Sequence, residues 1–349
     1  MSASDRPRRR ALLIPFAVLA GLVLIHGVYW IMASGQIASR AEAWIAAQEA
    51  AGYEIDHEGL SVRGYPFRFS LRARAPSIAA PEAEGGWRAS LDQLAATAQF
   101  YDLNHWILTP DGQARVQAMT EAGPADWRVS AESARLSVAG SNGLTRRLGA
   151  SAQALVLEAQ TGPQPAVRAI AAVNVSGLLT EAGALALRVQ ADDLQLADGV
   201  LDPALQTAFG REAAVWRMDA SITAFAALAR AGDPAEWRRA GGVLDIHQAQ
   251  LIWGAADVSG QGQVALDSRL WPEGRLSVIV TDPETLITTL VQAGLVHDEQ
   301  GEALRLAALM APRREGGIAL PLRLREGGLF LGPARIGAFA GAGADAQAE

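Results

Sequence analysis

The stretch YEIDHEGLSVRGYPFRFSLRARA, residues 53–75, decides the fold. Four apolar residues alternate in it with four polar ones: Phe67, Phe69, Leu71 and Ala73 with Arg68, Ser70, Arg72 and Arg74. Strict alternation predicts a β-strand with one buried and one solvent-exposed face. Gly64-Tyr65-Pro66 precedes this strand and predicts the turn of a hairpin whose first strand includes Leu60 and Val62.

Strands of the same kind recur along the rest of the chain. Alternating segments occupy residues 131–138, 151–159, 188–197 and 245–253. Residues 260–280 predict a hairpin that turns at Trp271-Pro272-Glu273-Gly274, and residues 327–337 predict a closing strand. AIAAVNV (169–175) and GALALRV (183–189) are apolar on both faces, so we expect them to be covered on both sides, by helices or by a bound acyl chain.

Helices are predicted where an aspartate precedes a proline. Asp202-Pro203, Asp233-Pro234 and Asp282-Pro283 each place a capping carboxylate before a proline at the first helical position. The second pair predicts a short helix stopped by Gly241-Gly242, and the third predicts one stopped at Gly294. A further helix is expected from Glu302 to Met310.

The N-terminal side of the hairpin predicts a membrane anchor. Residues 11–33, ALLIPFAVLAGLVLIHGVYWIMA, contain no charge and are long enough to span a bilayer as a helix. Arg8, Arg9 and Arg10 precede them and predict that residues 1–10 are a cytoplasmic basic segment. Tyr29 and Trp30 are expected at the outer membrane interface. The alternative is a cleaved signal peptide, although its apolar core would be shorter.

The expected fold class is therefore mainly β with a few helices (α+β), with one transmembrane helix followed by a large curved antiparallel β-sheet or groove domain. Residues 34–52 are predicted to form a membrane-proximal helix, with Ile37, Ala41, Trp44 and Ile45 at helical spacing and packed on the domain. Residues 53–337 form the β-rich domain, which this topology would place in the periplasm, and residues 338–349 a disordered tail.

Composition excludes several function classes. All 30 basic residues are arginine, so lysine chemistry is excluded, and there is no cysteine for disulfides, thiolates or cysteine-ligated zinc. The net charge of −7 makes nucleic acid a poor partner, because such binding depends on neutralising phosphates.

Catalytic patterns are weak, so we expect no enzyme, no cofactor and no metal. His57-Glu58 begins like a zinc-hydrolase motif, but Ser61 stands where the second histidine is needed. Residues 101–106, which include Asn104, His105 and Trp106, could line a ligand site, although a strand-end turn with its rings in the core is favoured. An enzyme would require several candidates to converge: His57, His105, His247, Asp192 and Glu132.

Taken in order, these features give the chain a family resemblance. It resembles the domain of unknown function 2125 family of envelope proteins in its basic start, its span ending Tyr29-Trp30, Gly64-Tyr65-Pro66-Phe67, the segment 101–106, and the closing Leu331-Gly332-Pro333. More distantly it is similar to AsmA-type proteins of the Gram-negative inner membrane, which are associated with lipid traffic through apolar β-grooves. The resemblance implies a location and an architecture but no mechanism.

Two functions remain open. The first is a non-enzymatic, inner-membrane-anchored periplasmic protein that shelters lipid acyl chains in an apolar β-groove. The second is a structural scaffold for envelope machinery without a small ligand. The expected partners are the membrane, with lipid or an envelope protein; the sequence leaves the oligomeric state open.

Overall fold

The computed structural model describes residues 8–141, 144–332 and 334–338, and the chain divides into two compact units, residues 1–121 and 122–349. These ranges contain nineteen strands and six α-helices, so the chain is mainly β, as predicted. Most of the segment predicted to be a disordered tail, from residue 339 on, lies outside the described residues, as do residues 1–7 of the basic segment.

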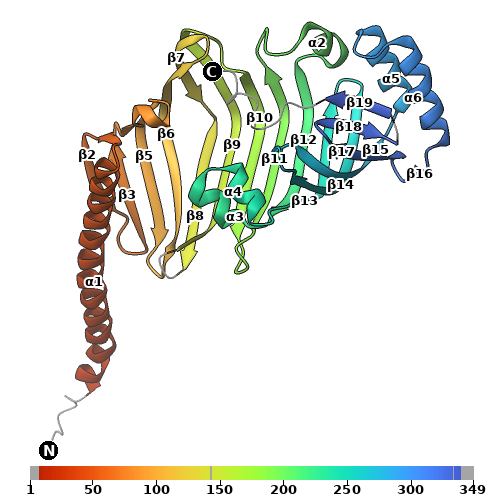
Figure 1. The fold of residues 1–349 in the computed structure, drawn as a ribbon. Helices are drawn as coiled ribbons and strands as arrows, with labels where there is room; N and C mark the ends of the chain where they lie inside the picture. Colours follow the sequence, from red (N-terminus) through yellow and green to blue (C-terminus); the bar gives the residue numbers. More distant parts are fainter. Residues whose placement is uncertain (1–7, 142–143, 333, 339–349) are drawn as a thin grey trace, which may run out of the picture. The chain divides into compact units, whose positions relative to one another are not determined.

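Unit 1 begins with one long helix, α1 (Arg8–Ala50) (Figure 1). This single helix includes both the predicted span and the predicted membrane-proximal segment. It ends in a turn in which the N–H of Tyr53 donates to the carbonyl of Gln48 and Gly52 adopts φ +97°. A side chain at Gly52 would be strained there, so glycine favours the stop at this position.

The first half of α1 is exposed and apolar. Residues 18–50 form a helix long and apolar enough to cross a membrane, and its most apolar stretch is not buried by the rest of the protein. Its exposed large side chains are Phe16, Val18, Leu19, Leu22, Val23, Leu24, Ile25, Val28, Ile31 and Met32. Farther along, Ile37, Ala41 and Ile45 are half-buried, but Trp44 is exposed. The expectation that Trp44 packs with this stripe is therefore wrong, because it projects from another side of the helix.

The strands of unit 1 form an antiparallel sheet beside the second half of α1. They are β1 (Glu54–Asp56), β2 (Gly59–Arg63), β3 (Arg68–Arg74), β4 (Ser77–Ala79), β5 (Arg88–Gln99) and β6 (Asp102–Thr120), with a 3₁₀ turn η1 (Glu82–Glu84). β5 pairs with β6 along one edge, and β4 and then β3 share its other edge. β2 pairs with β3, and β1 with β4.

The hairpin predicted around Gly64-Tyr65-Pro66 is confirmed, since β2 and β3 pair on either side of it. Phe69 is 0% exposed and is the largest fully buried side chain among the described residues. Phe67, predicted to share its buried face, instead lies in the turn before β3 and is 69% exposed. The N–H of Arg68 donates to the carbonyl of Gly64 and closes the turn. Phe67 therefore lies within the turn and not in the strand.

The described residues of unit 2 form thirteen strands and five short helices. The strands are β7 (Gly123–Ser130), β8 (Ser133–Ser141), β9 (Leu144–Thr161), β10 (Val167–Leu179), β11 (Leu185–Leu196), β12 (Glu212–Ile222), β13 (Leu244–Trp253), β14 (Ala256–Leu266), β15 (Pro272–Val280), β16 (Arg313–Arg314), β17 (Gly317–Arg325), β18 (Gly328–Leu331) and β19 (Ala334–Ala338). The helices are α2 (Pro203–Phe209), α3 (Phe225–Ala231), α4 (Pro234–Arg239), α5 (Pro283–Gln292) and α6 (Asp298–Met310).

The sheet of unit 2 is an antiparallel meander. β9 to β15 pair in chain order, β17 follows β15, and β18 and β19 continue the sheet. β8 and β7 lie one after the other along the free edge of β9. The closing segment predicted as one strand is thus two, β18 and β19.

The turn between β14 and β15 differs from its prediction. It was expected at Trp271–Gly274, but it runs from Asp267 to Trp271, and Pro272 is the first residue of β15. The carboxylate of Asp267 accepts from the backbone N–H groups of Arg269 and Trp271 at 2.7 and 2.9 Å. These two local hydrogen bonds stabilise a turn that ends before the proline on which the prediction relied.

All three predicted Asp-Pro helix starts are confirmed. The side chains of Asp202, Asp233 and Asp282 accept from backbone N–H groups in the first turns of α2, α4 and α5. By contrast, α3 follows Ala224, which has φ +51° and no capping side chain, and no sequence signal announces it.

Candidate functional site

One face of the unit 2 sheet is apolar across nine strands. The strand register aligns apolar side chains of β8 to β15 and β17 in three rows. The first row is Ala134, Ala152, Val173, Ala191, Trp216, Leu251, Val258, Val280 and Ile318; the second is Leu136, Ala150, Val175, Val189, Met218, Ala249, Gly260, Val278 and Leu320; the third is Val138, Leu148, Gly177, Leu187, Ala220, Ile246, Gly262, Leu276 and Leu322. We call these residues the apolar face.

The opposite face is polar. One of its rows is Arg135, Ser151, Asn174, Gln190, Arg217, Gln250, Ser259, Ile279 and Ala319. Asn174 and Ser176 of β10 are exposed here, so this strand does not have the two covered faces that its sequence predicted. The sheet is amphipathic, as expected when one side of an antiparallel sheet faces water.

The apolar face is incompletely covered. Trp216 is 41% exposed and Leu148 is 54% exposed, although both project from the rows just described. Within the described part of unit 2 the side chains below 2% exposure are small, such as those of Ala191 and Ala220. An apolar surface that the described residues leave partly uncovered is typical of a binding surface.

A hollow of about 200 Å³ lies on this face. Eight members of the three rows line it, together with Gln250, Ser259 and Gln261: Trp216, Ile246, Ala249, Leu251, Val258, Gly260, Leu276 and Val278. A β-bulge between Ile246 and Ala249 lets both project to the same side. We call this the apolar hollow.

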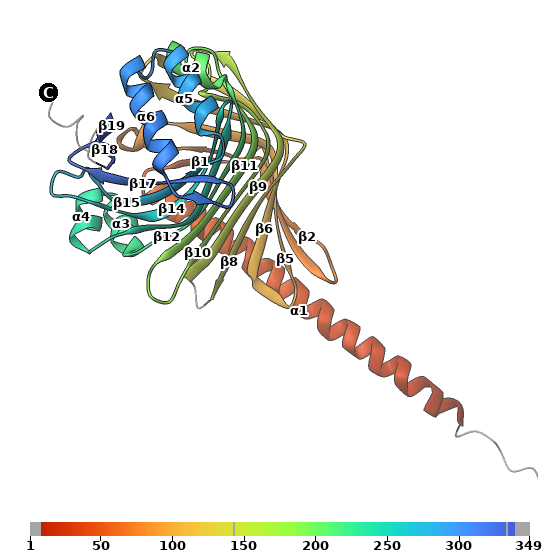
Figure 2. The same cartoon turned by 90° about the vertical axis from the view of Figure 1, so that its right-hand side faces the viewer.

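Figure 2 shows the strands of unit 2 bowed, with α3, α4, α5 and α6 on the hollow side of the bow. Helices that pack on a sheet cover its apolar face, because both elements must remove apolar surface from water.

A second hollow, of about 580 Å³, lies over the polar side of β13, β14, β15 and β17. Its charged lining is Asp245, His247, Arg275 and Arg323. The carboxylate of Asp245 accepts from Gln263 at 3.2 Å, and Asp245 lies 4.0 Å from His247. Arg275 and Arg323 are cross-strand neighbours, and neither has a hydrogen-bonding or ionic side-chain partner among the described residues.

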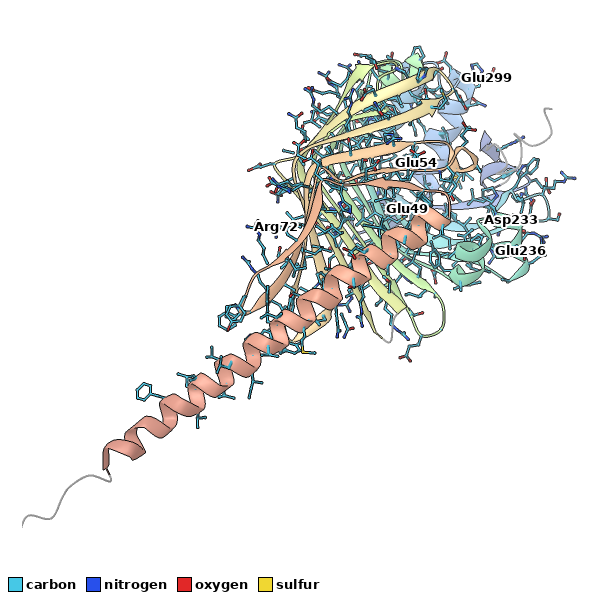
Figure 3. All side chains as sticks on the ribbon, turned by 90° about the vertical axis from the view of Figure 1, so that its left-hand side faces the viewer. Glu49, Glu54, Arg72, Asp233, Glu236 and Glu299 are labelled. Carbon is cyan, nitrogen blue, oxygen red and sulfur yellow. The ribbon has the colours of Figure 1, made fainter. Side chains whose placement is uncertain are left out.

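In unit 1, His26 and the predicted interface residue Trp30 contact the segment around the hairpin turn. Nε2 of His26 lies 2.7 Å from the carbonyl oxygen of Pro66, and Nε1 of Trp30 donates to the carbonyl of Arg68 at 3.2 Å. Trp30 also stacks on Phe69, with ring centroids 5.6 Å apart. Figure 3 shows the exposed part of α1 projecting beyond the strands, with Glu49 near its other end.

The aromatic rings that join α1 to the sheet form one cluster, which we call the aromatic collar. Its members are His26, Tyr29, Trp30, Tyr65, Phe69 and Phe100. Tyr65 makes edge contacts with Trp30 at 5.7 Å, and its hydroxyl approaches Gly27. Gly64 adopts φ +112°, and a side chain there would collide with the backbone of Arg68. The family-like motif Gly64–Phe67 is thus the part of the sheet that holds the helix.

The other aromatic motif lies at the start of β6. The indole N–H of Trp106 donates to the carbonyl of Leu103 at 2.9 Å, and the N–H of Asn104 donates to Asp102 at 3.2 Å. His105 is exposed and has an interaction partner. The strand-end turn is present, but its first ring, Tyr101, is 75% exposed and does not pack in the core as expected.

The candidate catalytic residues of unit 2 are dispersed. Asp192 lies on β11, where it forms an ion pair of 3.5 Å with Arg217, and His247 lies on β13, two strands away. Glu132 precedes β8. In unit 1, His57 follows β1 and His105 lies on β6. The described residues contain no group of three or more His, Asp or Glu that could hold a metal.

Two groups outside the hollows have shifted pKa values because of their hydrogen-bond partners. A hydrogen bond to Glu84 raises the pKa of Tyr53, and the Glu284 carboxylate raises the pKa of Arg305 by accepting its hydrogen bond. Neither group lines either hollow, so these shifts reflect local surface contacts.

Comparison with known proteins gives one match. Residues 30–340 match the family described as "Uncharacterized protein conserved in bacteria" (DUF2125). Neither the curated proteins nor the solved structures contain a match to the chain. The matched stretch begins at Trp30 of the aromatic collar and extends over most of both units. The chain belongs to the DUF2125 family.

Proposed function

We propose that this is a non-enzymatic protein anchored in the inner membrane by α1, with its β-rich units in the periplasm, and that its apolar face shelters lipid acyl chains. The observation that carries the proposal is the three-row apolar face, which contains no polar side chain over nine strands. Transfer of an acyl chain to such a surface gains about 0.8 kcal/mol for each methylene removed from water.

The orientation rests on the arginines that precede the span. Arg8, Arg9 and Arg10 come directly before an uncharged stretch, and positive charges beside a span favour the cytoplasmic side. Everything after Ala33 would then lie in the periplasm. A topology reporter fused after Ala338 tests this orientation: activity of a periplasm-specific reporter supports it, and activity of a cytosol-specific one contradicts it.

The chemistry of the apolar face favours an acyl chain over a polar ligand. Ala249 and Gly260 keep the floor of the apolar hollow low, while Trp216 and Leu251 border it with large apolar groups. Such a surface makes no hydrogen bonds, so it would select flexible apolar chains by shape and area and not by headgroup.

The absence of cysteine permits a clean test. Ala249→Cys places a single thiol in the apolar hollow, and Gln248→Cys, one residue away, places one opposite Asp219 on the polar face. Each is coupled in native membranes to a thiol-reactive photocrosslinker, and the products are identified by mass spectrometry. We expect phospholipid adducts at position 249 and few at position 248. Equal lipid labelling at the two positions, or none at 249, would contradict the proposal.

A second candidate function is a scaffold for envelope proteins, and α6 favours it. Leu306, Leu309 and Met310 are exposed at the C-terminal half of this helix. An exposed apolar stripe on a surface helix is typical of a docking site. Crosslinking from Leu309→Cys in cells, with Glu302→Cys in the same helix as the control, would return one dominant polypeptide if this function holds. Diffuse products similar to those from position 302 would exclude it.

A further inference from the structure

The hairpin turn between β2 and β3 contacts α1 within the predicted membrane span. His26 and Trp30, which contact Pro66 and Arg68, both lie inside the uncharged stretch 11–33. His26 is seven residues before Ala33, which corresponds to about 10 Å along the helix axis. If α1 crosses a bilayer, the hairpin turn is therefore beside the last turns of the span and not above them.

The side chains at these turns are apolar and uncovered. Phe67 is 69% exposed in the hairpin turn, Tyr101 is 75% exposed in the turn between β5 and β6, and Tyr65 is also exposed. Phe100 connects the two turns to the helix, because its ring contacts both His26 and Tyr101. Aromatic rings are the side chains that settle at the boundary between headgroups and hydrocarbon.

Two arginines flank the hairpin turn in the sequence Arg63-Gly64-Tyr65-Pro66-Phe67-Arg68. Both are exposed, and among the described residues neither guanidinium has an ion pair or a hydrogen bond. Lipid phosphates lie just outside the hydrocarbon, where arginine binds them through paired N–H groups. The charge and the spacing fit one occupant, the headgroup layer of an anionic bilayer.

We propose that the turns 64–67 and 100–101 form a second membrane contact, in which Phe67, Tyr65 and Tyr101 enter the lipid interface and Arg63 and Arg68 bind phosphates. This contact would fix the sheet of unit 1 relative to the membrane, because the aromatic collar already packs the span against that sheet. The inference requires that α1 cross a membrane, and it is independent of the apolar face and of the direction of insertion.

The test uses full-length protein reconstituted in vesicles of phosphatidylglycerol and phosphatidylcholine. Phe67→Cys carries an environment-sensitive fluorophore at the hairpin turn. Ala83→Cys carries the same probe in η1, which follows Pro81. Pro81 is a neighbour of Gly52, just after the C-terminal end of α1. Gly52 is 26 residues after His26, which corresponds to about 39 Å along the helix axis. We expect blue-shifted emission and quenching by lipid-attached nitroxides at position 67, and water-like emission at position 83.

Two outcomes would overturn the proposal. The probe at position 67 could remain as water-exposed as the probe at 83, which means that the turn stays above the membrane. It could instead be shielded from water but unquenched by lipid nitroxides, which means that protein covers it.

The arginines are tested separately in the same vesicles. The double substitution Arg63→Gln and Arg68→Gln should reduce nitroxide quenching at position 67 in phosphatidylglycerol vesicles to its value in phosphatidylcholine alone. Arg72→Gln and Arg74→Gln, farther along β3 (Arg72 is labelled in Figure 3), form the matched control. An equal loss with both pairs would show a general charge effect and would contradict specific phosphate binding.

Discussion

Phe67 and Phe69 differ by two positions but have opposite environments, and this difference can be measured. Phe69 is fully buried and stacks on Trp30, so Phe69→Ala removes core packing that is typically worth about 3–5 kcal/mol. Phe67→Ala removes an exposed ring and should change the free energy of unfolding by less than about 0.5 kcal/mol. Denaturant unfolding of both variants in detergent checks this. Similar losses in the two variants would mean that Phe67 is buried as well.

Asp282 gives unit 2 a local dependence on pH. The Thr285 hydroxyl and backbone N–H donate to its carboxylate and lower its pKa below the ordinary value of 3.8. A group with a lowered pKa stabilises the fold above its unfolded pKa, and the contribution is lost as the pH falls through the folded value. We therefore expect amide-exchange protection in the first turn of α5 to fall below about pH 4.

The control for this cap is Asp282→Ala. The variant has no carboxylate to titrate, so protection of the first turn should be lower at neutral pH and should not change further on acidification. Protection that still falls in the variant over the same pH range would place the titrating group elsewhere.

Residue-scale chemistry was well predicted where a short local motif decided it. The three Asp-Pro caps and the hairpin at Gly64-Tyr65-Pro66 depend only on neighbours in sequence, and all four were predicted. Tyr101 was misplaced because its environment depends on which strands and which helix lie beside it. Local sequence carries no record of those neighbours.

At the scale of elements, β15 and β17 contain an unfavourable pair. Arg275 and Arg323 are directly opposite, and like charges in this position destabilise a sheet. Arg323→Glu should turn the repulsion into an ion pair and raise the free energy of unfolding by about 0.2–1 kcal/mol. Unfolding at low salt should show the gain, and high salt should reduce it.

The matched control is Arg188→Glu in β11. Arg188 is opposite Asp219 in β12 and donates to it at 3.0 Å, so the same substitution should there replace attraction with repulsion and lower the stability. A change of the same sign in both variants would mean that general charge, not cross-strand pairing, dominates.

Elements without a local signal were missed. No capping side chain precedes α3. The turn between β14 and β15 depends on the carboxylate of Asp267, whereas the prediction relied on Pro272, which lies after the turn. Strands were easier, because alternation persists through each of them. The strands β18 and β19 were predicted as one because only two residues separate them, and the apolar pattern is interrupted only briefly.

At the scale of the whole molecule, the fold class and the single apolar N-terminal helix could be predicted, whereas the division into two units at Glu121 could not. Alternating strands look alike before and after this position. The apolar face likewise could not be predicted from the sequence, because it depends on the register of nine strands. Each strand contributes three apolar residues, most of them small or aliphatic, and only their alignment across the strands makes a continuous surface.

That alignment predicts how bound lipid affects stability. A ligand that binds only the folded state stabilises it by an amount that rises with concentration, about 2.7 kcal/mol at 100 times its dissociation constant. We therefore compare lipid-bound protein with full-length protein that has been stripped of lipid in a steroid-based detergent without an alkyl tail. The stripped protein should unfold at a lower temperature than the lipid-bound protein. Added lysophospholipid should restore the original midpoint. Ala249→Trp would fill the apolar hollow and remove this response, whereas Gln248→Trp on the polar face should keep it. Because these substitutions add the same ring one residue apart, a response that survives in both would place the acyl chain outside the apolar hollow.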